Sequence, residues 1–174
     1  MSWPPPVSAV AVIGVVIAAS FCDLRTRRLP NALTLGAAGV ALALHGITGG
    51  WPALVQAILG WAAGVALFVP LYALGGMGAG DVKLLGAIGA WLGPMGAVWT
   101  GLYGAIAGGI MALLVALGRG YAGTALRNVR TILVAWFLAG IKPVEGMTLA
   151  DNTSIRLPYA VPLAAGALAT LWMH

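Results

Sequence analysis

The sequence predicts an all-α, polytopic membrane protein with about six transmembrane helices and with both termini on the outside. Hydrophobic residues make up 61% and charged residues only 7% of the 174 residues. A soluble domain carries roughly a quarter of charged residues, so this composition excludes that class. The mean hydropathy is +0.99, and the chain divides into apolar runs near the ~20 residues that a helix needs to span a bilayer. At this length we expect one integral-membrane domain, residues 1–174.

The first apolar run, from about residue 7 to residue 22, is interpreted as a retained span. The arginines nearest to it follow the run instead of preceding it. A cleaved signal peptide shows the opposite order, with its basic residues first. We therefore expect the N-terminus outside and the polar loop 23–31 inside.

Turn-forming residues divide the remaining apolar sequence into further spans. The sequence TGGWP at 48–52 predicts a turn with Trp51 at the level of the membrane interface. The sequence GPMG at 93–96 predicts a break within the long apolar region 82–117. The expected spans are about 7–22, 32–47, 53–74, 82–93, 96–117 and 157–172.

The segment 119–156 differs from the rest because it mixes charged residues with one short apolar run, Ile132 to Ile141. A run of about ten residues is too short to span, and we interpret it as an interfacial or re-entrant piece. We expect the whole segment to lie on the cytoplasmic side.

Basic residues support this topology. Under it, the inside segments 23–31, 75–83 and 119–156 contain all nine lysines and arginines, as the positive-inside rule predicts. The same placement explains the net charge of +5 without a nucleic-acid partner, because the basic residues form no run or face.

Metal and cofactor chemistry is not expected. Cys22 is the single cysteine of the sequence, and the two histidines, His45 and His174, are far apart in it. Neither a multi-cysteine zinc site nor a histidine cluster can be built from these residues.

Glycine is abundant in the expected spans. The pairs at 60 and 64 and at 104 and 108 follow the small-xxx-small pattern, which lets two membrane helices approach closely. We interpret these pairs as helix-packing positions.

Two of the four acidic residues, Asp23 and Asp81, lie where an expected span meets the inner side. Each has a structural explanation by itself. Asp81 fits a helix N-cap or first-turn acid, which stabilises a helix by roughly 0.5–2 kcal/mol, and Asp23 fits an interfacial charge beside the arginines that follow it. Together they fit a second interpretation, in which helix packing brings both carboxylates to one place.

Two neighbouring carboxylates share a proton, so one can act as a base toward water while the other donates to a scissile carbonyl. No serine–histidine pairing lies within reach, since Ser8, Ser20 and Ser154 are far from either histidine in this topology. The glycines at 75, 76, 78 and 80 permit positive φ and close backbone approach. They fit either a track for an extended substrate or a flexible turn.

Two stretches together resemble the signature motifs of the type IV prepilin leader peptidases. These are DLRTRRLPN, from Asp23 to Asn31, and GAGDVKLLG, from Gly78 to Gly86. The tail RLPYAVPLAAGAL, from Arg156 to Leu168, is similar to the last span of that family. The two motifs in this order and at this separation are specific, whereas Gly-x-Gly-Asp alone is not.

The resemblance implies an intramembrane aspartic endopeptidase of the bacterial inner membrane that removes the leader of prepilins or pseudopilins on the cytoplasmic side. It implies Asp23 and Asp81 as the catalytic pair. Further motif positions, for substrate binding or support of the site, are Pro30, Asn31, Gly78, Gly80 and Lys83.

The sequence departs from the larger members of the family, which also methylate the new N-terminus and carry a cytoplasmic segment with paired cysteines. Residues 1–6 lead straight into the first span, so we expect a peptidase without methyltransferase activity, similar to the short form of the tight-adherence (Flp) pilus systems. Presenilin-like enzymes share Gly-x-Gly-Asp, but here PAL at 52–54 precedes Asp81 instead of following it.

Two other functions remain as alternatives. A small transporter would use the acids for ion coupling, although acids in transporters usually lie deeper in the membrane. A non-catalytic scaffold of a pilus or secretion machine would use the glycine-rich spans as interfaces and would not need either carboxylate.

Overall fold

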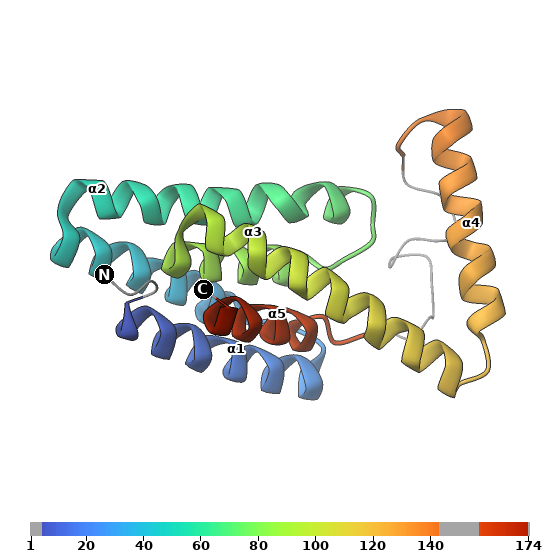
Figure 1. Cartoon of the computed structure of the whole chain (residues 1–174), viewed down its shortest axis with the longest axis horizontal. Helices are drawn as coiled ribbons and strands as arrows, with labels where there is room; N and C mark the ends of the chain where they lie inside the picture. The colour runs from blue at the N-terminus through green and yellow to red at the C-terminus, as the bar shows by residue number, and fades with distance from the viewer. Residues whose placement is uncertain (1–4, 143–156, 174) are drawn as a thin grey trace.

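The computed structural model describes residues 5–142 and 157–173 (Figure 1). All regular secondary structure in this part of the chain is α-helical, as the sequence predicts. The helices are α1 (Pro6–Thr26), α2 (Asn31–Ala73), α3 (Ala79–Gly118), α4 (Ala122–Ala139) and α5 (Ala160–Met173).

Helices α1 and α2 are joined by a shorter connection than the sequence suggests. Pro6 occupies the first turn of α1, where its missing N–H costs nothing. The helix continues past the apolar run to Thr26, so Asp23 is helical and does not belong to a loop. Arg27 ends α1 in the left-handed conformation, with φ 53°, and its N–H donates to the carbonyl oxygen of Asp23 at 2.9 Å. Pro30 then precedes the first residue of α2.

Helices α2 and α3 each double back at a glycine, so that each contributes two antiparallel arms (Figure 1). Gly50 has φ 64° and Gly93 has φ 72°, both outside the helical region. Glycine reaches such angles without the steric penalty of a side chain. A proline follows each, Pro52 and Pro94. The two breaks predicted from TGGWP and GPMG are confirmed.

The first arm of α3, from Ala79 to Gly93, is the centre of the bundle. Every residue from Leu84 to Leu92 is buried. Helix α3 packs mainly on α2, and α5 packs on both α3 and α1. Asp81, at the start of this arm, is therefore fixed by the best-packed helix of the molecule.

Small residues permit the closest helix contacts, as the glycine pattern predicts. A Cβ added to Gly60 of α2 would overlap the backbone of Gly89 in α3, and one added to Gly64 would overlap the backbone of Leu85 in the same helix. Gly104 of α3 fits against Leu163 of α5. Such contacts let backbones meet where van der Waals packing, and not water exclusion, drives association.

Many large apolar residues lie on the outer surface of the bundle. Helices α1, α2 and α3 are long and apolar enough to cross a membrane, yet only 28%, 22% and 22% of their most apolar windows are buried inside the structure. A large exposed apolar surface of this kind fits contact with lipid. Helix α5 is apolar but shorter, at 14 residues, and the expected total of six spans stays a prediction.

Helix α4 extends further toward the N-terminus than the apolar run that was expected at 132–141, since it begins at Ala122. It is not among the described helices that are apolar enough to cross a membrane. Its only helix neighbour in the described chain is α3. The rest of the expected cytoplasmic segment, residues 143–156 with Glu145 and Asp151, lies outside the described residues.

Candidate active site

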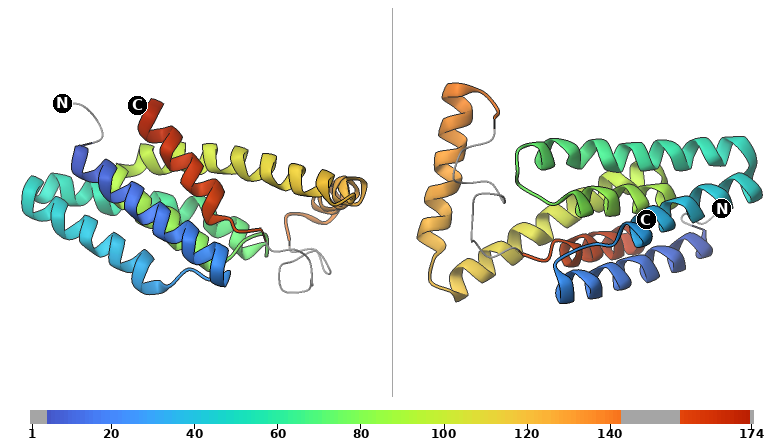
Figure 2. Two further views of the ribbon diagram at one scale, coloured as in Figure 1. Left: turned by 90° about the horizontal axis from the view of Figure 1, so that it is seen from below. Right: turned by 180° about the vertical axis from the view of Figure 1, so that it is seen from behind.

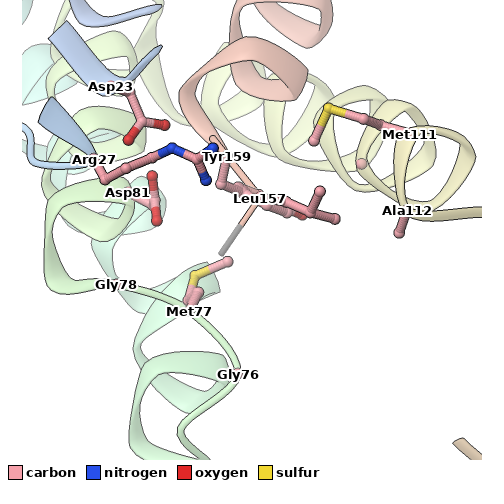
Figure 3. Close-up of a pocket in the computed structure, with 11 residues that line it drawn as sticks. Asp23, Arg27, Gly76, Met77, Gly78, Asp81, Met111, Ala112, Leu157 and Tyr159 are labelled. Atoms are coloured by element: carbon pink, nitrogen blue, oxygen red, sulfur yellow. The ribbon is translucent and has the colours of Figure 1, made fainter. Parts of the chain in front are cut away.

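A cavity of about 290 Å³ opens at the end of the bundle where α1 ends and where α3 and α5 begin. Figure 3 shows its lining, which comes from four separate parts of the chain. The lining residues are Asp23, Arg27, Gly76, Met77, Gly78, Asp81, Gly108, Met111, Ala112, Leu157 and Tyr159.

Asp23 is held by the start of α5. The residue is only 7% exposed, and its Oδ2 accepts a hydrogen bond from the N–H of Ala160 at 3.1 Å. Ser20, one turn earlier in α1, donates from Oγ to the carbonyl oxygen of the same Ala160 at 3.4 Å. One face of α1 thus holds the N-terminus of α5, and a buried carboxylate obtains the partner that it needs.

Asp81 lies in the first turn of α3, half-buried. Gly78 is the N-cap of this helix and accepts the backbone N–H of Asp81 at 3.2 Å. A Cβ at Gly78 would come within 3.3 Å of Asp81 Oδ2, so glycine leaves room for the carboxylate. Of the four glycines before Asp81, only Gly75 has a positive φ, at 74°. The positive φ that these glycines permit is thus adopted at Gly75 alone, whereas Gly78 and Gly80 allow close approach.

The fold brings Asp23 and Asp81 to the same cavity although a complete helical hairpin separates them in the sequence. Their carboxylates are close enough to interact electrostatically, and Figure 3 shows both on the same side of the cavity. Two acids at one solvent-accessible point can share a proton. The juxtaposition that the sequence suggested is therefore present.

The other predicted motif residues fix the acid-bearing turn, and most of them stay outside the cavity. A Cβ at Gly80 would lie 3.0 Å from the Cβ of Leu29, which shows how closely the two connections pack. Pro30 is the N-cap of α2. Lys83 donates from Nζ to Oδ1 of Asn31 at 2.9 Å, joining the starts of α2 and α3. Among the five motif positions, only Gly78 lines the cavity.

Sequence reasoning missed several lining residues, of which Arg27 is the most polar. Arg27 follows Asp23 by one helical turn, a spacing that places two side chains on the same face of a helix. Figure 3 shows its side chain passing the two acids and pointing toward Tyr159. The four-residue spacing between Asp23 and Arg27 is the sequence signal that indicates a place for Arg27 beside the acid. Its positive φ, rare for a residue with a Cβ, is a second unusual feature of this turn.

The remaining wall is apolar and comes from distant segments. Met77, Met111 and Leu157 line it, and methionine side chains adapt easily to different apolar partners. The ring of Tyr159 packs edge-to-face on Phe68, with centroids 6.1 Å apart, and lies against Gly108. No local sequence signal marks these residues, because they meet only when α5 returns to the bundle.

This arrangement is suited to acid–base chemistry on an amide. Two carboxylates, one close to a backbone donor and the other at a helix start, stand beside an arginine and an apolar wall. Such a site can hold a water molecule between the acids and an apolar side chain of a bound peptide beside them.

Comparison with known proteins gives the family. The family model described as the type IV leader peptidase family matches residues 10–113, a region that contains both Asp23 and Asp81. The match covers more than half of the sequence. The chain belongs to this family.

Three similar proteins each carry the name "Prepilin leader peptidase/N-methyltransferase". The protein of Aeromonas salmonicida is 38% identical over 112 residues, which are 58% of this chain and 38% of that protein. That of Burkholderia pseudomallei is 36% identical over 126 residues, 67% of this chain and 40% of the relative. The Neisseria gonorrhoeae protein is 34% identical over 138 residues, 70% of this chain and 47% of its own length.

The matched region of this chain thus spans less than half the length of these relatives. No solved structure matches significantly. Residues 10–113, which carry Asp23 and Asp81, are the part of the chain that matches the type IV leader peptidase family.

Proposed function

We propose that this protein is an intramembrane aspartic endopeptidase that removes the leader peptide from prepilins or pseudopilins, with Asp23 and Asp81 as its catalytic pair. One observation carries the proposal. Within the region that matches the leader peptidase family, the two acids come from separate helices and line a single cavity. Two neighbouring carboxylates, one of them buried, destabilise the fold, and such costly groupings of acids are typical of functional sites.

In the proposed reaction the pair holds one proton and one water molecule. The ionised carboxylate takes a proton from the water, whose oxygen attacks the carbonyl carbon of the scissile peptide bond. The protonated carboxylate donates to the carbonyl oxygen, and the tetrahedral intermediate then collapses as the amine leaves with a proton. The hydrogen bond from Ala160 to Asp23 orients one of the two groups throughout.

The apolar wall favours a substrate with an apolar segment next to the scissile bond. Met77, Met111 and Leu157 offer adaptable contacts there. Gly76 and Gly78, at the rim, leave the backbone accessible to an extended peptide. A prepilin would enter laterally from lipid and keep its basic leader on the side of the basic loops.

We place the protein in the bacterial inner membrane with six spans, both termini outside and the acids at the cytoplasmic face. The support is the charge distribution, because all nine basic residues fall in segments expected at the acid-bearing end. The reversals at Gly50 and Gly93 add to it, since they divide α2 and α3 into antiparallel arms.

We assign the peptidase activity, and not methyl transfer, to this chain. The names of the relatives combine two activities, and the matched region contains the two acids that the peptidase reaction needs. Incubation of the cleaved product with S-adenosylmethionine and the protein, followed by mass measurement, tests this assignment. An added methyl group would contradict it.

The main test is co-expression with candidate prepilins and a gel for leader removal. We expect Asp23→Asn and Asp81→Asn each to abolish cleavage, because general acid–base groups contribute roughly 10²–10⁴-fold each. Asparagine keeps an acceptor for the Ala160 N–H, so the protein should still insert and accumulate.

Cys22→Ser is the matched control, since it alters the same turn of α1 without touching the cavity lining. Membrane fractions must contain all three variants in similar amounts. Retained cleavage in either asparagine variant would refute the catalytic pair.

A further inference from the structure

Helix α4 carries an exposed apolar stripe that no other described helix covers. Leu126, Val129, Leu133 and Phe137 follow one another at spacings of three and four residues, which places them on one face of a helix. All four are exposed, Leu126 by 73% and Phe137 by 88%. The only helix neighbour of α4 in the described chain is α3.

The opposite face of α4 is polar in its first half, up to Thr131, and continues with the exposed apolar residues Val134 and Leu138 in its second half. By helical spacing, Arg127, Thr131 and Thr124 share this face, and Arg130 lies at its border with the stripe. Arg127 donates to Thr124 Oγ1 at 3.5 Å, and the hydroxyl of Thr131 donates to the carbonyl oxygen of Arg127 at 2.9 Å. The sequence from residue 119 to residue 142 contains four basic residues and no acidic residue. The charge of this region is therefore positive and unbalanced.

The position of α4 suits a surface helix. It follows α3 after a turn in which Gly120 has φ 73°. Figure 1 shows it running across the long direction of the bundle, and Figure 2 shows it close to end-on in its first view. Since α3 is apolar and long enough to cross a membrane, a helix that leaves its end sideways lies along the plane of the bilayer surface.

We propose that α4 lies in the headgroup region of an anionic lipid leaflet, with its apolar stripe toward the acyl chains and with Arg127 and Arg130 at the lipid phosphates. An amphipathic helix with basic residues beside an apolar face binds such surfaces through buried apolar area and charge together. Each arginine near an anionic surface contributes attraction that falls off within a Debye length. The long arginine side chains reach the phosphates while their stems cover the apolar border.

The lipid surface explains the stripe and the charge at once. A second copy of the chain would place the same unbalanced positive charge against itself, and like charges oppose that contact. The proposal does not depend on the peptidase function, because it concerns a helix outside the cavity lining.

The test uses the full-length chain with Cys22 changed to serine, so that a single spin label can be attached at an introduced cysteine. Labels are placed at Leu133, on the stripe, and at Thr131, two residues earlier on the opposite face. The protein is reconstituted in nanodiscs of phosphatidylethanolamine and phosphatidylglycerol. Collision rates with oxygen, which concentrates in acyl chains, and with a water-soluble nickel chelate are then compared.

We expect oxygen to dominate at position 133 and the nickel chelate to dominate at position 131. The same accessibility to both reagents at the two positions would overturn the proposal. So would protection of position 133 from both reagents, which indicates cover by protein. Spin–spin broadening at 133 that disappears on dilution with unlabelled protein would overturn it in favour of a second copy.

The role of charge is tested with the double variant Arg127→Gln/Arg130→Gln. In the parent, we expect the oxygen preference at 133 to weaken when phosphatidylglycerol is replaced by phosphatidylcholine. In the double variant this lipid dependence should be lost. The matched control is Arg25→Gln/Arg28→Gln, which removes the same charge elsewhere and should keep the dependence. Equal loss in both double variants would overturn the assignment to α4.

Discussion

The helical bundle and helix α4 bury their apolar residues in different ways. In the bundle, glycines let backbones meet, and the first arm of α3 is buried from Leu84 to Leu92. Among the described helices only α3 contacts α4, and the leucines of α4 and Phe137 are exposed. This difference indicates that helix packing inside the bundle sets the position of the two acids. The position of α4 depends instead on the lipid or solvent around it. A change in the bundle should reach the site, and a change in α4 should not.

The largest expected difference between the bundle and α4 is in how each affects the pH dependence of cleavage. A catalytic pair that works with one shared proton loses its base when both carboxylates are protonated and loses its acid when both are ionised. Cleavage should therefore fall on both sides of an optimum, by about tenfold per pH unit on each limb. A cleavage assay across pH, with substrate binding followed in parallel, measures this.

Arg127 and Arg130 of α4 do not line the cavity that holds the two acids. The Arg127→Gln/Arg130→Gln variant should consequently give the same bell-shaped profile. A displaced optimum in that variant would show that α4 is coupled to the acids and would remove the distinction between the two regions.

The second effect concerns packing inside the bundle. Gly89→Ala should destabilise the protein by about 1–3 kcal/mol, because its Cβ would overlap the backbone of Gly60 and overpacking costs that much. Thermal unfolding in detergent, followed by tryptophan fluorescence, measures the loss. Cleavage activity should fall with it.

The matched control lies in the same helix. A Cβ added to Gly109 would have nothing within 4 Å, and alanine in a helix interior is favoured over glycine by roughly 0.5–1 kcal/mol. Gly109→Ala should thus melt at the same temperature or slightly higher. Equal destabilisation by both substitutions would show that helix propensity, and not close approach, limits the bundle.

A smaller effect is expected at the contact between Lys83 and Asn31. Removing either partner, by Lys83→Met or Asn31→Leu, should reduce cleavage by about fivefold, which corresponds to the ~1 kcal/mol of one hydrogen bond. The double variant should lose little more than each single one, because the two residues act through one contact. Fully additive losses would mean that Lys83 or Asn31 acts on the substrate directly.

The smallest effect is expected from α4. In detergent, where no anionic leaflet is present, Arg127→Gln/Arg130→Gln should change the cleavage rate by less than about twofold, as surface substitutions away from a site usually do. Rates measured with a detergent-solubilised prepilin give this value. A loss as large as that of the Lys83 variants would place α4 in the path of the substrate.

The sequence alone determined which stretches are apolar and where they break. Hydrophobicity and turn chemistry are local properties, and they located the reversals at Gly50 and Gly93 and the packing glycines of α2 and α3. The two motifs also indicated the acids, the glycines and the Asn31 and Lys83 positions. These features depend on residue type and spacing, which can be read along a single chain.

Only the tertiary structure decided which of these residues share a space. It placed Gly78 in the cavity and Asn31 with Lys83 outside it. The cavity also gained Arg27 and Tyr159, and the N–H of Ala160 reached Asp23. Contacts between α1, the two arms of α3 and α5 form only when helices far apart in the sequence pack together, because no local pattern encodes the register of one helix against another.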